Sequence, residues 1–346
     1  MKNLLKNKFI NKLCVRIVNI TIPIKSIRKN LRQQLQYIRL DDFKDKFSAK
    51  YPDYYQFVMF QPWGDFYITA SLLSEFKKDN DGAKILAVCV NQEQKIVLET
   101  FSAIDKIEII KKEFYNELLS INLPKNFKQQ LEKGKLYCLS HWHYSDADKN
   151  KSYNFLELYT KMLGLKYPTK LTVSNILNLK TISNNILIYP EANSFDYSEI
   201  TKDFWISLAD DITSMGYNVI FNSKKQTYGK YQTIFYPMNK SIEFAKHCKF
   251  VIGMRSGFGD ILAINKVKNH IVVYPKSMYF KTITKEQQEK EFQRAFVMEE
   301  DKTFEENMKR ITSLRMFNDC ATEIYFRDER TLKNKILKNI KGEKDD

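Results

Sequence analysis

Cysteine is scarce in this sequence, and no two cysteines stand at short spacing. The five cysteines are Cys14, Cys89, Cys138, Cys248 and Cys320, and no C-x-x-C pattern occurs. This spacing excludes the common zinc modules and gives no disulfide framework. Scattered thiols are typical of a reducing compartment, so we expect a cytoplasmic protein.

Long apolar runs are also missing. The longest run near the amino terminus, residues 13–24, contains Arg16 and is shorter than the roughly 20 apolar residues that cross a bilayer. No segment combines the charged start, apolar centre and small-residue cleavage site of a secretory signal. We therefore expect neither a membrane-spanning helix nor a signal peptide.

Acidic residues are absent from residues 1–40, which carry ten basic side chains. These are Lys2, Lys6, Lys8, Lys12, Arg16, Lys25, Arg28, Lys29, Arg32 and Arg39. Among them Leu5, Phe9, Leu13 and Ile17 recur at helical spacing. A basic amphipathic helix can lie on an anionic membrane surface. It can equally be a solvated helix packed on the domain behind it, and the sequence leaves both readings open.

The chain does have enough apolar material for sizeable cores. Of its 346 residues, 43% are hydrophobic and 14% aromatic, and this length suits two domains of ordinary size. The net charge of +15 favours an anionic partner, which leaves nucleic acid, an acidic membrane surface or a phosphorylated substrate.

From residue 55 onward, short β-rich runs alternate with amphipathic helical stretches. We expect strands at residues 55–60, 84–90, 106–110, 136–139, 185–189, 218–222, 250–252 and 270–274. We expect helices at residues 67–77, 94–101, 111–133, 153–163, 204–215, 241–247, 286–296 and 304–315. Such alternation indicates α/β architecture with parallel, doubly wound sheets.

A polar connection at residues 168–180 separates two series of similar order. Two Rossmann-like, doubly wound domains facing a cleft fit this pattern, and ligands bind near the carboxyl ends of strands beside such a cleft. The predicted segments are a basic amphipathic segment (1–48), an N-terminal Rossmann-like domain (49–167), a C-terminal Rossmann-like domain (168–325) and a basic helix with its tail (326–346).

The most informative stretch is FVIGMRSGFGDILA at residues 250–263, a strand, a tight turn and the start of a helix. Ser256 suits the N-cap of a helix that begins near residue 258. A glycine-containing turn that enters a helix N-terminus presents free N–H groups to an anion, and Arg255 adds a cation suited to phosphate. An ordinary strand-to-helix connection with a capping serine explains the pattern equally well.

Four stretches carry a resemblance to a known family. FVMFQPWGDFYITASLL matches an opening strand with a Gly-Asp turn and a helix, and ILIYPEANS stands where a strand ends in a His-Pro-Gly-like turn. FWISLADDITSMGYNVIF gives a tryptophan-bearing helix and the next strand, and VIGMRSGFGD takes the place of an Asp-Thr-Gly turn. In this order, across roughly residues 55–274, the chain resembles the heptosyltransferase-like glycosyltransferases of bacterial surface polysaccharide synthesis.

The resemblance implies the GT-B fold, with an acceptor domain at residues 49–167 and a nucleotide-sugar-binding domain at residues 168–325. It implies metal-independent, cofactor-free transfer of a sugar from a nucleotide-sugar donor to a growing surface glycan such as lipopolysaccharide or capsule. With the basic amino terminus, it implies a peripheral location on the cytoplasmic face of the inner membrane.

The resemblance also implies roles for individual residues. Asp65 corresponds to the family's catalytic base, although it also suits an N-cap for a helix starting near residue 67. The implied donor-binding residues are Pro190, Asn193, Ser194, Lys202, Asn222, Arg255, Ser256, Gly257 and Asp260. The implied acceptor-binding residues are Trp63, Gly64, His141 and His143. Simple turn chemistry for residues 190–194 and a salt bridge between Asp260 and Arg255 are the alternatives.

The sequence departs from the family pattern at two places. Arg255 replaces an acidic residue, so the late turn must contact its ligand differently. Phe204 and Trp205 lack the usual following proline, and Lys202 is a substitute cation. His141 and His143 share a strand face, but no third metal ligand stands at suitable spacing, which leaves acceptor contact or a structural role.

The sequence leaves two other functions open. A fucosyltransferase-like GT-B enzyme that uses a GDP-sugar also fits an arginine-bearing phosphate turn. A non-enzymatic nucleic-acid-binding protein fits the net charge, but the sequence holds no recognised nucleic-acid motif and its basic excess lies at the termini. We therefore favour the glycosyltransferase and expect no nucleic-acid partner.

Overall fold

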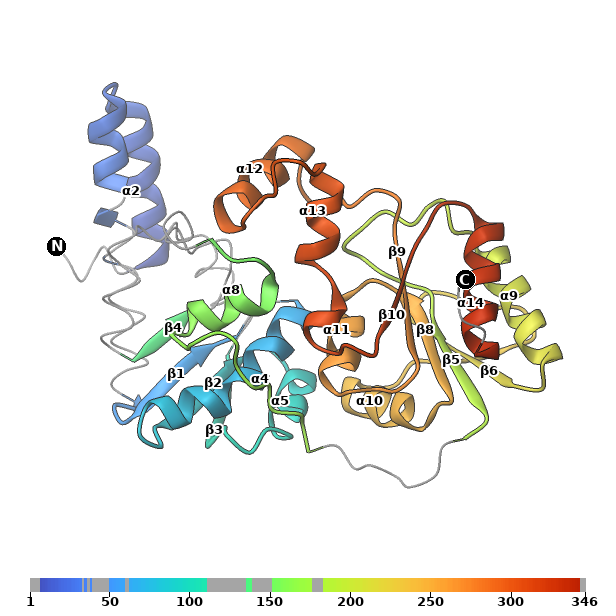
Figure 1. Cartoon of the computed structure of the whole chain (residues 1–346). Coiled ribbons are helices and arrows are strands. Elements are labelled where there is room, and N and C mark those ends of the chain that lie inside the picture. Colours follow the sequence, from blue (N-terminus) through green and yellow to red (C-terminus); the bar gives the residue numbers. More distant parts are fainter. Residues whose placement is uncertain are drawn as a thin grey trace. The chain divides into compact units, whose positions relative to one another are not determined.

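The computed structural model describes residues 7–32, 34–35, 38, 50–59, 62–110, 135–138, 151–175 and 183–342 (Figure 1). Contacts divide the chain into two units. Unit 1 comprises Met1–Phe60, Lys77–Leu98 and Ala103–Asp146, and unit 2 comprises Gln61–Phe76, Glu99–Ser102 and Ala147–Asp346. The predicted boundary at residue 168 would place residues 147–167 in the first domain, whereas their contacts place them in unit 2. The predicted roles of the two domains stay predictions.

Unit 1 contains a parallel four-stranded sheet in the order β3-β2-β1-β4. Its strands are β1 (Tyr54–Val58), β2 (Lys84–Cys89), β3 (Lys106–Ile109) and β4 (Leu136–Cys138), and α5 (Gln92–Leu98) lies between β2 and β3. The apolar runs that predicted β1 and β2 are buried, as expected for parallel strands covered on both faces. The four predicted strands are confirmed.

Unit 2 contains a parallel six-stranded sheet in the order β10-β9-β8-β5-β6-β7. The strands are β5 (Asn185–Tyr189), β6 (Asn218–Asn222), β7 (Gln232–Ile234), β8 (Phe250–Met254), β9 (His270–Tyr274) and β10 (Thr322–Tyr325). The predicted strands β5, β6, β8 and β9 are confirmed. The sequence missed β7 and β10, which are short edge strands whose side chains are mostly half-buried.

The helices of unit 2 follow the predicted order. They are α8 (Phe155–Met162), α9 (Lys202–Ser214), α10 (Met238–His247), α11 (Gly257–Ile264), α12 (Lys285–Ala295), α13 (Phe304–Ile311) and α14 (Glu329–Lys341). Gly164 and Gly216 follow α8 and α9 with φ of 72° and 88°, so both helices end where a residue without Cβ takes the left-handed conformation.

The predicted helix at 304–315 is wrong at its carboxyl end. Helix α13 stops at Ile311, and a short 3₁₀ turn, η3 (Leu314–Met316), follows. The carboxylate of Glu323 on β10 accepts hydrogen bonds from the Ser313 hydroxyl at 2.9 Å and the Leu314 N–H at 2.6 Å. These contacts redirect the chain, because the backbone groups that a continuing helix would use are bound elsewhere.

Helix α4 (Trp63–Asp79) starts four residues before its predicted start at residue 67. Asp65 therefore lies in its first turn instead of preceding it, and the predicted N-cap role of Asp65 is wrong. An acidic side chain in the first turn still faces the positive end of the helix dipole.

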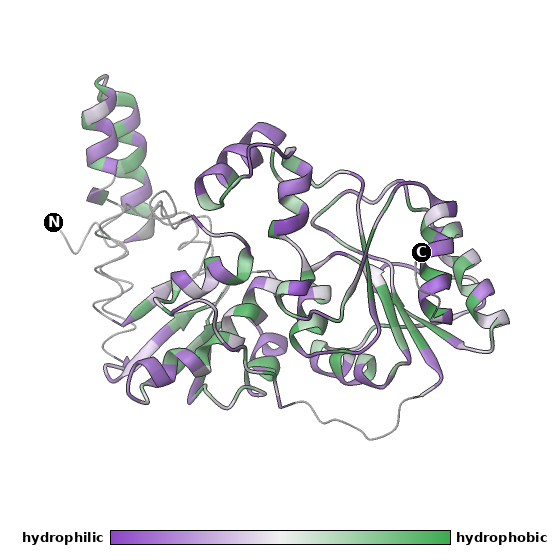
Figure 2. Cartoon of the chain, in the orientation of Figure 1, coloured by the Kyte–Doolittle hydropathy of each residue, from purple (hydrophilic) through white to green (hydrophobic). Residues whose placement is uncertain are grey.

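The basic amino-terminal segment contains helix α2 (Lys8–Thr21), which begins at the N-cap Asn7. Its apolar side chains are exposed, with 78% exposure for Phe9 and 84% for Ile20. Hydrophobic and hydrophilic residues alternate along this helix (Figure 2). Within the described part of the chain, no helix combines the length and apolar character needed to cross a membrane.

A buried apolar cluster holds β8 and α11 together. Its members are Leu187, Tyr189, Ile220, Ala245, Cys248, Val251, Leu262 and Val267. The turn between β8 and α11 is therefore anchored on both sides by packed side chains, which fixes the position of residues 255–257.

Candidate active site

The carboxyl ends of three neighbouring strands gather most of the predicted donor-binding residues. β5 lies between β8 and β6, and all three run parallel. Pro190–Ser194 follow β5, Asn222 ends β6, and Arg255–Gly257 follow β8. Because the strands are parallel, these residues lie together at the carboxyl-terminal edge of the unit 2 sheet, which is the edge formed by the strand ends and not by an outer strand. Ligands of α/β proteins bind there.

Hydrogen bonds tie the loops of this edge together. The Ser223 hydroxyl donates to the Glu191 carboxylate, and the Lys225 ammonium donates to Asn193 Oδ1 at 3.0 Å. Lys202 is exposed in the first turn of α9, with its ammonium 5.9 Å from the centre of the Tyr228 ring. Within the described residues, the buried Asn222 Oδ1 has no hydrogen-bond partner, so this edge holds an acceptor that a ligand can satisfy.

Ser256 is the N-cap of α11, as predicted. Its hydroxyl accepts from the Gly259 N–H at 3.4 Å, and its backbone is extended before the helix begins at Gly257. The helix starts one residue earlier than expected. Its remaining first-turn N–H groups give the edge a positive dipole end.

Arg255 lies inside the protein with 6% exposure. Its Nε donates to the Thr312 carbonyl at 2.9 Å, and one terminal nitrogen donates to the Ser256 carbonyl at 2.9 Å. The other terminal nitrogen pairs with the Asp260 carboxylate at 2.7 Å. The predicted salt bridge between Asp260 and Arg255 is confirmed. The guanidinium, predicted to bind diphosphate, has most of its donors bound to protein groups, which favours a positioning role.

Asp65 lies beside this ion pair, within unit 2. Its carboxylate accepts a hydrogen bond from the Tyr159 hydroxyl of α8. Burial raises the pKa of Asp65 to about 6, and the Tyr159 hydroxyl and the Arg255 charge oppose that rise. A carboxyl group with this pKa is largely ionised at neutral pH yet more basic than an ordinary aspartate, as general-base catalysis requires.

Asp260 responds to the same surroundings. Burial raises its pKa to about 6, the Arg255 guanidinium opposes the rise, and the neighbouring charge of Asp65 adds to it. Two carboxyl groups therefore flank one guanidinium, and the cluster can hold or release a proton near neutral pH. Perturbed groups of this kind concentrate at functional sites.

The backbones of α4 and α11 meet at two glycines. A Cβ on Gly64 would lie 2.6 Å from the Asp260 Oδ2 and 2.9 Å from the Gly257 Cα, and a Cβ on Gly257 would lie 2.8 Å from the Gly64 nitrogen. The sequence predicted Gly257 as a phosphate contact and Gly64 as an acceptor contact. Both have a packing reason of their own, since they let two helix N-termini approach closely.

A buried pair supports the cluster from β5 and β9. The Tyr189 hydroxyl lies 2.6 Å from His270 Nε2, and burial lowers the pKa of His270 to about 3, so the imidazole is neutral. Gly253 stands opposite Tyr189 in the sheet, where a Cβ would lie 2.3 Å from the Tyr189 ring. Sequence patterns did not indicate Tyr159, Tyr189 or His270. Tyr159 and His270 lie inside predicted elements without a motif, and Tyr189 is an apolar-run residue of the ILIYPEANS stretch with no polar signal of its own.

The predicted acceptor residues are only partly described. Trp63 is half-buried in α4, with its ring edge-to-face against Phe66 at 5.5 Å between centroids. His141 and His143 lie outside the described residues. In the part of the chain that the structure describes, no group of three His, Cys, Asp or Glu side chains could hold a metal ion.

Comparison with solved structures identifies the fold. The chain superposes on Escherichia coli heptosyltransferase WaaC with ADP, with a TM-score of 0.52, 11% identity and coverage of 82% of this chain and 99% of that one. It also superposes on E. coli ADP-heptose lps heptosyltransferase II, with a TM-score of 0.55, 11% identity and coverage of 83% and 98%. A glycosyl transferase family 9 structure from Veillonella parvula superposes with a TM-score of 0.53 and 11% identity, and the match covers 84% of this chain and 97% of that one.

These similarities confirm the predicted α/β fold of GT-B type and, at the level of fold, the predicted resemblance to heptosyltransferases. No protein-family model and no curated protein sequence matches the chain. The shared architecture therefore reaches well beyond detectable sequence similarity, and the chemistry of the site depends on this chain's own residues.

Proposed function

We propose that the protein is a glycosyltransferase that moves a sugar from a nucleotide-sugar donor to a hydroxyl of a bacterial surface glycan, without a metal ion. The observation that carries the proposal is the Asp65 carboxyl group, whose pKa is raised to about 6 beside the Arg255–Asp260 pair. It belongs to the same unit as the ligand-binding edge of the sheet. Solved structures with this fold include a heptosyltransferase with ADP, which supports a nucleotide-sugar donor.

In the proposed reaction, Asp65 takes the proton of the acceptor hydroxyl while its oxygen attacks the anomeric carbon of the donor. The bond between that carbon and the phosphate oxygen breaks, and the nucleoside diphosphate leaves with the electron pair. The N-terminus of α11 and the exposed Lys202 stabilise the developing charge, as helix dipoles and cations do for leaving phosphates. Asn222 and the Pro190–Ser194 turn hold the remainder of the donor.

Arg255 and Asp260 have a positioning role in this proposal. Their ion pair joins the turn after β8 to Thr312 and faces Asp65. The guanidinium thus fixes the carboxyl groups and limits the rise in the pKa of Asp65 without contacting the diphosphate. The proposed site thus has one base, Asp65, beside a buried ion pair of Arg255 and Asp260.

Helix α2 supports the further proposal that the protein binds the anionic cytoplasmic face of the inner membrane. Its apolar side chains Phe9, Leu13, Ile17 and Ile20 are exposed, and residues 1–40 carry only basic charges. An amphipathic basic helix combines apolar insertion with attraction to anionic lipid. Such a location would bring the enzyme to a lipid-linked glycan.

A nucleotide screen tests the donor assignment. Thermal unfolding would be followed with nucleoside diphosphates of each base, with the matching nucleosides as controls. Selective stabilisation by one diphosphate is the expected result, since a ligand that binds only the folded state raises the unfolding temperature. If every diphosphate and its nucleoside left the unfolding temperature unchanged, the protein would not use a nucleotide-sugar donor.

A further inference from the structure

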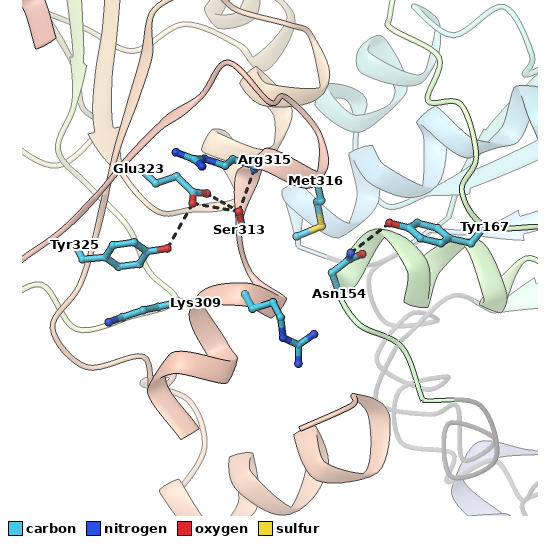
Figure 3. A pocket seen from close by; sticks show the side chains of 9 residues that line it. Asn154, Tyr167, Lys309, Ser313, Arg315, Met316, Glu323 and Tyr325 are labelled. Atoms are coloured by element: carbon cyan, nitrogen blue, oxygen red, sulfur yellow. Dashed lines mark hydrogen bonds between the residues drawn. The ribbon is translucent and has the colours of Figure 1, made fainter. Parts of the chain in front are cut away.

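An open cavity of about 410 Å³ lies in unit 2 between α8, α13 and β10 (Figure 3). Lys309, Arg315, Glu323 and Tyr325 line one side, and Asn154 and Tyr167 line the other. None of these residues belongs to the predicted donor or acceptor set. The cavity therefore offers binding groups that the proposed reaction has not used.

The one carboxylate in the lining of this cavity is held in place by hydrogen bonds. The Glu323 carboxylate accepts from the Tyr274 hydroxyl at 2.8 Å, the Ser313 hydroxyl at 2.9 Å and the Leu314 N–H at 2.6 Å. These bonds fix Glu323 to the 3₁₀ turn that ends α13. The carboxylate is thus a fixed part of the cavity wall, and the cationic side chains of Lys309, Arg310 and Arg315 outnumber it in the lining.

The positive charge is available. The Lys309 ammonium lies over the Tyr325 ring, 4.7 Å from its centre. Arg315 is exposed, and its guanidinium makes no hydrogen bond to another described residue. Arg310, by contrast, is bound to Glu299 at 3.0 Å and to backbone carbonyls. The free charge of the cavity is therefore that of Lys309 and Arg315, which suits a phosphate or carboxylate.

The opposite side supplies neutral polar and aromatic groups. The Asn154 amide donates to the Tyr167 hydroxyl at 3.4 Å, while the Asn154 carbonyl oxygen caps α8. Amide and phenol groups bind sugar hydroxyls, and the faces of Tyr167 and Tyr325 provide apolar contact area. Cations on one side and sugar-binding groups on the other are complementary to a charged saccharide.

The cavity lies close to the proposed base. Asn154 caps the helix that carries Tyr159, and five residues of helix span roughly 8 Å at about 1.5 Å per residue. Tyr159 hydrogen-bonds Asp65. On the other wall, Thr312, which accepts from Arg255, directly precedes Ser313 of the cavity. Two elements of the cavity wall, α8 and the chain after α13, therefore also carry residues that contact Asp65 and Arg255.

We propose that this cavity is an acceptor subsite that binds a saccharide bearing a phosphate or carboxylate group. Lys309 and Arg315 bind the anionic group, and Asn154 and Tyr167 bind the sugar hydroxyls. The assignment of this saccharide to the acceptor rests on the proposed glycosyltransferase function. The preference of the cavity for an anionic saccharide depends only on the side chains that line it.

Ligand-observed saturation-transfer NMR on the full-length protein tests the proposal, with glucose 6-phosphate, glucuronate and glucose as probes. We expect both anionic sugars to bind and glucose to bind more weakly by about tenfold, the scale of one charge-assisted hydrogen bond. Arg315→Gln and Lys309→Gln should each weaken the anionic sugars by a similar factor, and Arg315→Lys should retain most binding. Arg330→Gln, an exposed charge on α14, is the matched control and should change nothing.

Three results would overturn the proposal. The first is that glucose binds as tightly as the anionic sugars. The second is that Arg330→Gln loses as much sugar affinity as the cavity variants. The third is that inorganic phosphate displaces the anionic sugars and glucose gives no saturation transfer.

Nucleoside diphosphate affinity is the separate readout. If Lys309→Gln and Arg315→Gln weaken diphosphate binding instead, the cavity serves the donor and the acceptor assignment fails. If no diphosphate binds at all, the proposed function fails while the saccharide result still decides the cavity's chemistry.

Discussion

At the scale of single residues, the central feature is a carboxyl group whose protonation is set by its surroundings. Asp65 is partly buried, accepts from Tyr159 and faces the Arg255–Asp260 pair. The sequence could indicate Asp65 because a Gly-Asp turn follows a strand. It could not indicate Tyr159, since a tyrosine within a helix has no spacing signal, and only packing brings it to Asp65.

Replacing Asp65 with Asn should leave the fold intact and reduce sugar transfer by about a hundredfold or more, the usual contribution of a general base. Steady-state release of nucleoside diphosphate measures the loss. Asp203→Asn is the matched control, because Asp203 is an exposed acid in the first turn of α9. Full activity of the Asp65 variant would leave Asp65 with a structural role only.

The pH profile should carry the signature of the same group. A base works in its ionised form, so kcat/KM should rise with pH through about 6, where Asp65 loses its proton. An ordinary aspartate would place this rise near pH 4. A profile that is flat between pH 5 and 8 would show that a different group takes the proton.

Arg255 should behave as a structural cation. Arg255→Leu leaves the Asp260 carboxyl buried without its partner and should lower the free energy of unfolding by about 3–5 kcal/mol. Urea unfolding measures this, and Arg255→Leu/Asp260→Leu should recover part of the loss. Arg330→Leu, at an exposed arginine of α14, is the control. Undiminished stability together with selective loss of diphosphate binding would restore the direct phosphate role indicated by the sequence.

At the scale of elements, the site is built from two helix N-termini that meet at glycines. Strand and helix positions were largely predictable, because apolar runs and capping residues such as Ser256 act locally. The early start of α4 was not, because the stretch QPWGD is typical of a turn, and only the structure shows Gly64 inside a helix and packed against α11. The break after α13 was missed because its cause, Glu323, lies on a strand too short to give a periodic pattern.

The glycine contact gives a prediction at this scale. Gly64→Ala and Gly257→Ala should each destabilise the protein by about 1–3 kcal/mol, the cost of forcing an extra carbon into a packed contact. Gly259→Ala is the matched control in α11, because its Cβ would meet neighbouring atoms at 3.4 Å, an ordinary contact. Thermal unfolding would show the order, and an equal effect at all three sites would rule out the close approach as the cause.

Helix α2 gives a second prediction at the scale of elements. The variant Phe9→Gln/Ile20→Gln should lower binding to anionic phospholipid vesicles by about tenfold or more, since each exposed apolar side chain contributes on the order of 1.5 kcal/mol when buried. Phe235→Gln, which removes an exposed apolar side chain from unit 2, is the control. Vesicle flotation measures the change, and unaltered flotation of the α2 variant would contradict membrane binding through this helix.

At the scale of the whole molecule, the GT-B fold was predictable from the order of its strands and helices, although identity to solved relatives is only 11%. The order of elements depends on apolar periodicity, which survives sequence change. The chemistry of the site does not follow from that order. An arginine at position 255 reads as a phosphate ligand in the sequence, and only the fold shows that its donors turn inward to Asp260 and Thr312.

The most direct test of the central claim is release of nucleoside diphosphate from a panel of nucleotide sugars, with a bacterial glycolipid extract as the acceptor source. The wild-type protein and the Asp203→Asn control should release diphosphate from one nucleotide sugar only when the extract is present, and Asp65→Asn should be slower by about a hundredfold or more. Acceptor-dependent release at the wild-type rate by Asp65→Asn, or no release from any nucleotide sugar by the wild-type protein, would contradict the proposed glycosyltransferase.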